Sequence, residues 1–370
     1  VATLVTIFLL GQGLGVLPAG LLADRFGRRP VLWGGLAIYI LGAIAATFAP
    51  TIELMILARL LWGVGAAGPR VATTAMIRDA YEGTEMARQM SLIMAVFLVV
   101  PTIAPAIGTA LLAVGPWQLV YLICAVAGLA LLAASFRLPA TMPVDARRSV
   151  SMREVGHSIW TVLSTPGSVG YLIGLTALFG SFMAYLGSSE IIIDEIFGLS
   201  DWFAVIFGGV AMVMAVGMLM NGRIVGRIGL VSTLKVVMAA LLVANAVAIA
   251  AAVLTGGTPS LVVYLLALTP VIVFVQMLGP NINAAFMQPL GHVAGVAAAV
   301  IAMVPMVGGA LLGNVINDAY DGTITPMVIG FAVAAVIAAG TLAWSHHARL
   351  SSVSGERDEP SSELSGVTTD

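Results

Sequence analysis

The sequence predicts an all-α polytopic membrane protein. Of its 370 residues, 60% are hydrophobic and only 9% are charged, and the mean hydropathy is +1.05. A soluble domain carries about 25% charged residues, so this chain has too few charges to cover a surface that faces water. Long apolar runs, each close to the roughly 20 residues that a helix needs to cross a bilayer, follow one another along the chain. A soluble enzyme, a disordered chain and a disulfide scaffold are therefore excluded.

Eleven apolar runs, separated by charges, prolines or clustered glycines, are the predicted membrane spans. The segment 137–167 interrupts them, because it contains four arginines together with Pro139 and Pro143, and we expect a polar cytoplasmic linker there. An N-terminal half-bundle is expected over 1–136, a C-terminal half-bundle of six helices over 168–346, and a disordered cytoplasmic tail over 347–370. The predicted spans are 2–22, 31–49, 53–77, 90–113, 117–136, 168–190, 202–222, 234–254, 261–285, 293–316 and 325–345.

Lysine and arginine are confined to alternate connections between these spans. The connections on one side and the tail hold 14 of the 16 cationic residues, the connections on the other side hold none, and the remaining two lie within a span. By the positive-inside rule, the basic connections and the C-terminus face the cytoplasm. We therefore expect an integral protein of the cell membrane, that is, of an inner or plasma membrane.

An internal repeat indicates two related halves. Gly20, Arg25 and Gly27 recur 202 residues later, and Val100–Pro101 recurs 204 residues later. Duplicated halves are typical of transporters. Since the second half begins near residue 168, the first would begin about 35 residues before Val1, and we expect the first of twelve helices to lie upstream of this sequence. The repeated residues are Gly222, Arg227 and Gly229, and Val304–Pro305.

Several motifs resemble the major facilitator superfamily. The segment GLLADRFGRRPVL is similar to the signature between the second and third helices of that family, and ARLLWGVGAAG (58–68) is similar to its fourth-helix motif with a membrane-embedded arginine, here Arg59. The run 90–112 resembles the Bcr/CflA multidrug-resistance branch, whose fifth helix carries an antiporter motif. The resemblance implies a monomer with two pseudo-symmetric six-helix halves. The signature residues are Gly20, Asp24, Arg25, Gly27, Arg28 and Arg29, and those of the antiporter motif are Pro101, Pro105 and Gly108.

The charged signature predicts a gate. Asp24 beside three arginines at a helix end can form a cluster that clamps one half against the other and opens during transport. A carboxylate at the positive N-terminus of a neighbouring helix would add about 0.3–1 kcal/mol. The alternative is that Arg25, Arg28 and Arg29 only set the topology.

Two arginines within a span are candidate transport residues. A charge at bilayer depth costs about 2.5–3.5 kcal/mol on insertion scales, which favours a functional role. Arg59 and Arg70 are eleven residues apart, so both are expected on one helix face, about 16 Å apart along the axis. Arg70 is an extra charge relative to the family pattern, and Trp62 stands where the family usually has Gln. The alternatives are a structural tie for Arg59 and snorkelling to the cytoplasmic rim for Arg70.

Three further groups have both a functional and a structural interpretation. The bend at Pro101, Pro105 and Gly108 either seals an antiporter against leakage or serves helix packing. Glu190 is the one candidate for proton coupling found within a span, and it is either the coupling group or part of an exposed acidic rim; the coupling group can also belong to the missing first helix. Trp62, Phe179, Phe182 and Tyr185 are candidates for an apolar substrate pocket, or face lipid.

These observations favour a secondary active transporter that exports drug-like or amphipathic small molecules in exchange for protons. The alternative is a symporter or facilitator that imports a small metabolite. We expect no enzyme activity and no cofactor: the chain has no Walker A sequence for a nucleotide, its histidines lack metal-ligand spacing, and its net charge of −2 gives no bulk attraction to nucleic acid. The glycine-rich GQGLG at 11–15 lies within a span, where it predicts close helix contacts. The expected partners are the substrate, protons and the lipid bilayer.

Overall fold

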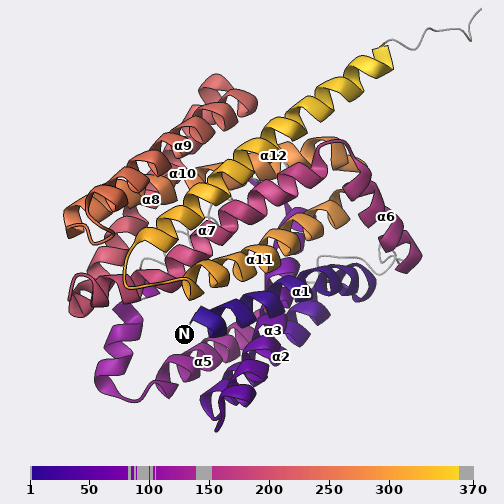
Figure 1. Ribbon diagram of the computed structural model, residues 1–370. Coiled ribbons are helices and arrows are strands. Elements are labelled where there is room, and N and C mark those ends of the chain that lie inside the picture. Colours follow the sequence, from indigo (N-terminus) through magenta and orange to yellow (C-terminus); the bar gives the residue numbers. More distant parts are fainter. Residues whose placement is uncertain are drawn as a thin grey trace, which may run out of the picture.

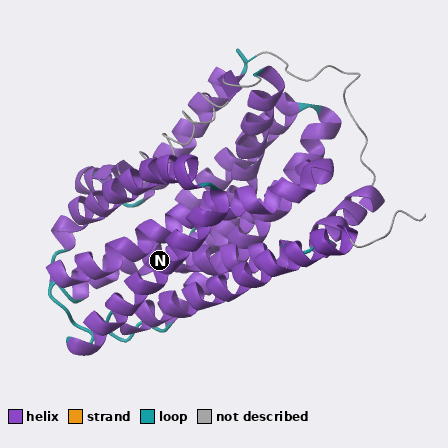
Figure 2. Ribbon diagram, turned by 90° about the horizontal axis from the view of Figure 1, so that it is seen from above, coloured by secondary structure: helices purple, strands orange, loops and turns teal. Residues whose placement is uncertain are grey.

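The computed structural model describes residues 2–81, 85–86, 89, 100, 103–104, 106–138 and 152–357. This part of the chain is helical apart from short turns and loops (Figure 2). Ten of its helices are long and apolar enough to cross a membrane. The remaining predicted span, 90–113, lies largely outside the described residues. The predicted all-α membrane architecture is therefore confirmed, with ten spans described.

A first group of helices packs through small residues. A side chain on Gly11 or Gly63 would overlap backbone atoms of the neighbouring helix, the Leu60 carbonyl in one case and the Phe8 carbonyl in the other. The predicted role of GQGLG in close helix contacts is thereby confirmed. Such contacts are usual between membrane helices, because small residues let two backbones approach. The group comprises α1 (Ala2–Phe26), α2 (Arg28–Thr47), α3 (Ile52–Ala80) and α5 (Gln118–Ser135).

A second group of helices surrounds one large apolar core. Its most enclosed members include Phe286 and Phe331, whose side chains are inaccessible to solvent. Within this core, Asn221 and Asn281 donate hydrogen bonds to each other through their amide groups, so that both are satisfied away from water. The group comprises α7 (Ser168–Glu195), α8 (Phe203–Ile228), α9 (Leu230–Leu254), α10 (Leu261–Met287), α11 (Ala294–Asp318) and α12 (Thr325–Arg357), with short 3-10 helices η2 (Ser200–Trp202) and η3 (Gln288–Val293).

The two groups meet where α1 lies beside α11 (Figure 1). Gly13 is at the closest point, since a Cβ there would lie 2.6 Å from Val307 Cγ2. Nearby, the buried side chains of Val16 and Ala19 contact Ala299 and Ala302. This seam of small side chains is the main contact between the groups in the described chain.

The turn between α1 and α2 has the same backbone conformation as the turn between α8 and α9. Gly27 has φ 96° and ψ 166°, and Gly229 has φ 79° and ψ 166°. Each amide donates to the carbonyl four residues earlier, that of Ala23 or Val225. A positive φ of this size favours glycine, because any other L-residue would be strained. The two turns stand 202 residues apart, the offset of the sequence repeat.

Two segments differ from the sequence-based expectation. The linker 137–167 contains a helix, α6 (Met152–Ser164), which buries Val155 and Val162 and leaves Trp160 exposed. The last helix continues to Arg357, past residue 347, where a disordered tail is expected. No proline interrupts it there, and the Arg349 guanidinium lies 4.6 Å from the centre of the Tyr171 ring, which ties this end of α12 to α7. Residues 358–370 lie outside the described part of the chain.

Candidate functional site

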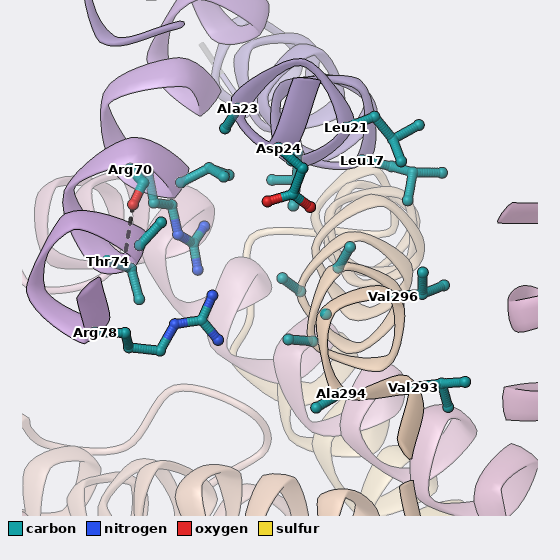
Figure 3. A pocket seen from close by; sticks show the side chains of 18 of the residues that line it. Leu17, Leu21, Ala23, Asp24, Arg70, Thr74, Arg78, Val293, Ala294 and Val296 are labelled. Atoms are coloured by element: carbon teal, nitrogen blue, oxygen red, sulfur yellow. Dashed lines mark hydrogen bonds between the residues drawn. The ribbon is translucent and has the colours of Figure 1, made fainter. Parts of the chain in front are cut away.

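A cavity of about 460 Å³ lies between the two groups of helices, a volume within the range of small-molecule sites (Figure 3). It is formed by the C-terminal ends of α1 and α3 and by the N-terminal end of α11, with single residues from α2 and α6. We call the end of the molecule that contains this cavity the arginine end. The lining residues are Val16, Leu17, Gly20, Leu21, Ala23, Asp24, Arg28, Arg70, Val71, Thr74, Ala75, Arg78, Ser158, Val293, Ala294, Gly295, Val296, Ala298, Ala299 and Ala302.

Arg28 connects two carboxylates at the edge of this cavity. Its Nη1 donates to Asp24 Oδ1 at 2.5 Å, and its Nε donates to Asp79 Oδ2 at 2.9 Å. The arginine side chain is 11% exposed, and the side chains of Asp24 and Asp79 are 47% and 25% exposed. Since Asp24 is on α1, Arg28 on α2 and Asp79 on α3, this cluster holds three helices of the first group together at the arginine end.

The other signature arginines do not pair with Asp24. Arg29 donates to the Phe136 carbonyl at 3.2 Å and lies over the Trp33 ring, and the exposed Arg25 lies over Phe26. These contacts therefore do not form the expected clamp between the two halves, because every described partner of the signature arginines belongs to the first group of helices. The reason is geometric, because the helix-end position of Asp24 brings it within reach of α2 in its own group. Gly20, one turn earlier, leaves open space on the cavity wall.

Arg70 and Arg78 lie on the same face of α3 and both line the cavity. Figure 3 shows both guanidinium groups directed into it, with Thr74 between them. Arg70 Nη1 is 3.9 Å from the sulfur of Met306 on α11, and Thr74 donates its hydroxyl to the Arg70 carbonyl at 3.0 Å. Arg78 is absent from the residues that sequence reasoning selected, because it was counted only as a topology-setting charge. The spacing of eight residues between Arg70 and Arg78 is the sequence feature that could have identified Arg78 as a second arginine beside Arg70.

Arg59 lies outside the cavity, among aromatic side chains between α3 and α5. Its Nη2 donates to the Tyr121 hydroxyl at 2.9 Å, and its guanidinium lies over the rings of Tyr121 and Trp62. Trp62 is 4% exposed and makes edge contacts with Phe8, Tyr39 and Tyr121. The structure therefore separates Arg59 from Arg70, and neither Arg59 nor Trp62 lines the cavity. These contacts correspond to the alternative interpretation of Arg59, in which the arginine is a structural tie.

The remaining sequence candidates are also outside the cavity. Glu190 is exposed on α7, and Tyr185 is buried, with its ring stacked on Phe207 at 5.7 Å. Phe179 and Phe182 pack against each other with ring centres 6.4 Å apart. These aromatic residues belong to the second group of helices, where Tyr185 borders a void of only about 10 Å³. Of the antiporter motif, Pro101 and Pro105 lie outside the described residues, and Gly108 has open space around its Cα.

At the opposite end of the molecule the two groups are in contact. The first turns of α1 meet α7 and α11 there, around a void of only about 10 Å³ lined by Val5, Thr6, Leu9, Met183, Gly187, Asn314 and Asn317. Ser188 donates to Asn317 Oδ1 at 2.5 Å, and Asn314 donates to Asp318 at 3.1 Å. Among the described residues, the space between the groups is thus about 460 Å³ at the arginine end and about 10 Å³ at the other.

Comparison with known proteins identifies the family of the chain. The family model described as "Major Facilitator Superfamily" matches residues 1–313. A protein of Bacillus subtilis named "Uncharacterized MFS-type transporter YdgK" is 27% identical over 346 residues, which are 92% of this chain and 84% of that protein. The "Bicyclomycin resistance protein homolog" of Haemophilus influenzae is 25% identical over 339 residues, 90% of this chain and 83% of that protein.

Solved structures have the same fold. The crystal structure of a D-xylose-proton symporter has a TM-score of 0.70 against this chain, with 12% identity, and covers 91% of this chain and 86% of its own. At this identity the likeness shows the fold alone. The family match and the ten long apolar helices together show that the protein is an integral membrane protein.

Proposed function

Because the chain belongs to the major facilitator superfamily, we propose that it is a secondary active transporter that exports drug-like or amphipathic small molecules in exchange for protons. The observation that carries this proposal is the space between the two groups of helices, which among the described residues is about 460 Å³ at the arginine end and about 10 Å³ at the opposite end. A transporter that works by alternating access needs a central site that is accessible from one side at a time. The drug-resistance relative supports efflux.

The arginine end is assigned to the cytoplasm in this proposal. Arg25, Arg28 and Arg29 lie there together with Arg70 and Arg78 of α3 and Arg153 of α6, in keeping with the positive-inside rule. The cavity is then open to the cytoplasm, and the C-terminus is cytoplasmic. A compound that enters from inside the cell would reach the cavity directly, as an exporter requires.

Export would proceed by rocking of two six-helix halves about the seam between α1 and α11. The matching turns at Gly27 and Gly229 support a pseudo-symmetric arrangement of these halves. Closing the arginine end would bring Asp24 toward the N-terminus of α11, whose first residues line the opposite wall. A carboxylate is stabilised there by about 0.3–1 kcal/mol or more if buried. Asp24 would thus act as a gate in the closed state while Arg28 holds it in the open one.

Protons are proposed as the counter-ion because the motifs resemble the drug:proton antiporter branch. Asp24 is the carboxylate among the described lining residues, and Glu190 lies exposed on α7, so these two are the described candidates for proton exchange. Transport by a monomer is the corresponding expectation. Import of a small metabolite by symport remains the alternative, and its direction separates it from export.

The test is transport in everted membrane vesicles from a host that lacks its own drug exporters. With an imposed inward-acid pH gradient, we expect vesicles containing the protein to accumulate bicyclomycin or phenylnaphthylamine, and a protonophore to abolish accumulation. Accumulation that ignores both the pH gradient and the membrane potential would contradict proton coupling. Uptake of the same compounds by intact cells, driven by the proton gradient, would replace export with import.

A further inference from the structure

Two arginines in the cavity lack an acidic partner in the described part of the chain. Arg70 and Arg78 are separated by eight residues, about 12 Å along the axis of α3. Both line the cavity, and Figure 3 shows their guanidinium groups entering it from the same wall. Neither forms a salt bridge with a described residue, and the contact of Arg70 with Met306 is to sulfur, a weak acceptor.

The carboxylates near this site are already engaged. Asp24 and Asp79 both accept from Arg28, whose three-residue cluster was described above. The described lining residues include three arginines and one aspartate, and adding Asp79 still leaves one positive charge in excess. Arg70 and Arg78 therefore make the cavity electropositive. Two like charges facing one low-dielectric space repel each other, which an anion between them would relieve.

Apart from Asp24, Arg28 and Ser158, the residues on the other described walls of the cavity are apolar. They include Val16 and Ala23 of α1 and Ala299 and Ala302 of α11. The cavity thus has a cationic wall on α3 and a largely apolar wall on α1 and α11, with Asp24 at its edge. A molecule that complements both has an acidic group at one end and a hydrocarbon or aromatic body at the other.

We propose that this cavity binds amphipathic organic anions, with the acidic group held between Arg70 and Arg78 and the apolar body against α1 and α11. The inference rests on the proposed function, because it takes the cavity to be the substrate site. Guanidinium groups bind carboxylate, sulfonate and phosphate through paired N–H donors, so any of these acidic groups fits. A soluble organic anion and the headgroup of an anionic lipid share this chemistry.

A matched pair of fluorescent probes tests the charge preference. Anilinonaphthalene sulfonate and phenylnaphthylamine share an aromatic body and differ in the sulfonate. Binding is measured with the full chain in phosphatidylcholine nanodiscs, and empty discs supply the background. We expect the sulfonate probe to bind about tenfold more tightly than the neutral one. Arg70→Gln and Arg78→Gln should each weaken the sulfonate probe about tenfold, the effect of losing one charge-assisted hydrogen-bonding group, and change the neutral probe less than twofold.

Control variants separate charge from folding. Arg223→Gln removes an exposed arginine of α8 that does not line the cavity, and should leave both probes unchanged. Arg70→Lys and Arg78→Lys keep the charge and should retain most of the sulfonate binding. Equal affinity of the wild type for the two probes, parallel loss of both in the Gln variants, or a loss in the Lys variants as complete as in the Gln variants would each overturn the proposal.

The source of the anion is decided in the same system. Phosphatidylglycerol that displaces the sulfonate probe from the wild type, and not from the Gln variants, identifies a lipid headgroup as the occupant, whereas no displacement identifies a soluble anion. Both results support the anion site. The two proposals fail in different ways. Charge-selective binding without transport would overturn the proposed export and leave the anion site standing. Efflux of phenylnaphthylamine with no charge preference in binding would overturn the anion site and leave the proposed export standing.

Discussion

Gly13 of α1 lies directly against Val307 of α11, with 2.6 Å between an imagined Cβ and Val307 Cγ2. This contact is in the seam between the two groups of helices, where interior packing tolerates little added volume. Its position makes it a sensitive point for any motion of one group against the other.

Gly13→Ala is therefore expected to lower the efflux rate at least fivefold while the protein still inserts into the membrane. The added methyl group displaces Val307 and costs about 1–3 kcal/mol in the state that has this seam closed. Transport in everted vesicles, normalised to the amount of inserted protein, is the measurement. Val307→Ala in the same chain should restore transport, and no restoration would show that the steric contact is not the cause.

Asp24→Asn is expected to reduce efflux to the background of empty vesicles. The neutral amide weakens the hydrogen bond to Arg28 and removes the negative charge that the proposed gate uses. Asp201→Asn is the matched control, because Asp201 is exposed in η2 and outside the cavity. If Asp24→Asn transports at the control rate, the gating role of the signature aspartate is wrong.

Arg59 is expected to matter for stability first. Arg59→Ala removes the hydrogen bond to Tyr121 and the contact with two aromatic rings, which together amount to about 3 kcal/mol. Tyr121→Phe removes only the hydroxyl and should cost about 1 kcal/mol. Thermal unfolding of the purified protein ranks the two variants. Arg153→Ala, on an exposed position of α6, gives the reference value. A wild-type unfolding temperature for Arg59→Ala would exclude a structural tie.

The turn glycines offer a test of the repeat. Gly27→Ala and Gly229→Ala place a Cβ at a positive φ with ψ 166°, a conformation essentially confined to glycine, so each should cost about 1–3 kcal/mol of stability. Gly34→Ala lies in a helix with open space at the Cα, and should be neutral or stabilise by about 0.4–1 kcal/mol. Thermal unfolding again reads out the differences. Clearly unequal effects at Gly27 and Gly229 would argue against equivalent turns.

The helices were predictable because apolar length is a strong signal in a membrane protein, and the Asp24–Arg28 pair was predictable because the two residues are four apart and belong to a recognisable signature. The helix α6 was missed because its charged residues mark it as a linker, although Val155 and Val162 are seven residues apart, the spacing of one helix face. Helix length and charge are thus the sequence features from which the fold can be predicted.

The placement of Arg59 shows where sequence reasoning stops. The 100° rotation per residue gives the direction of a side chain around its own helix, and on that basis Arg59 and Arg70 are expected on one face of α3. The rotation does not say which neighbouring helix each side chain contacts. Tyr121 is on α5 and Met306 on α11, so the two arginines enter different surroundings. Long-range packing of this kind follows from the tertiary structure only.

The α11 wall of the cavity is built largely from alanine, including the half-buried Ala294 and Ala298. An alanine that faces open space accepts a larger side chain without disturbing the helix behind it. Selection for resistance to a new compound should therefore accumulate substitutions on this wall, where each added methylene reshapes the passage, rather than among the tightly packed glycines of α1 and α3.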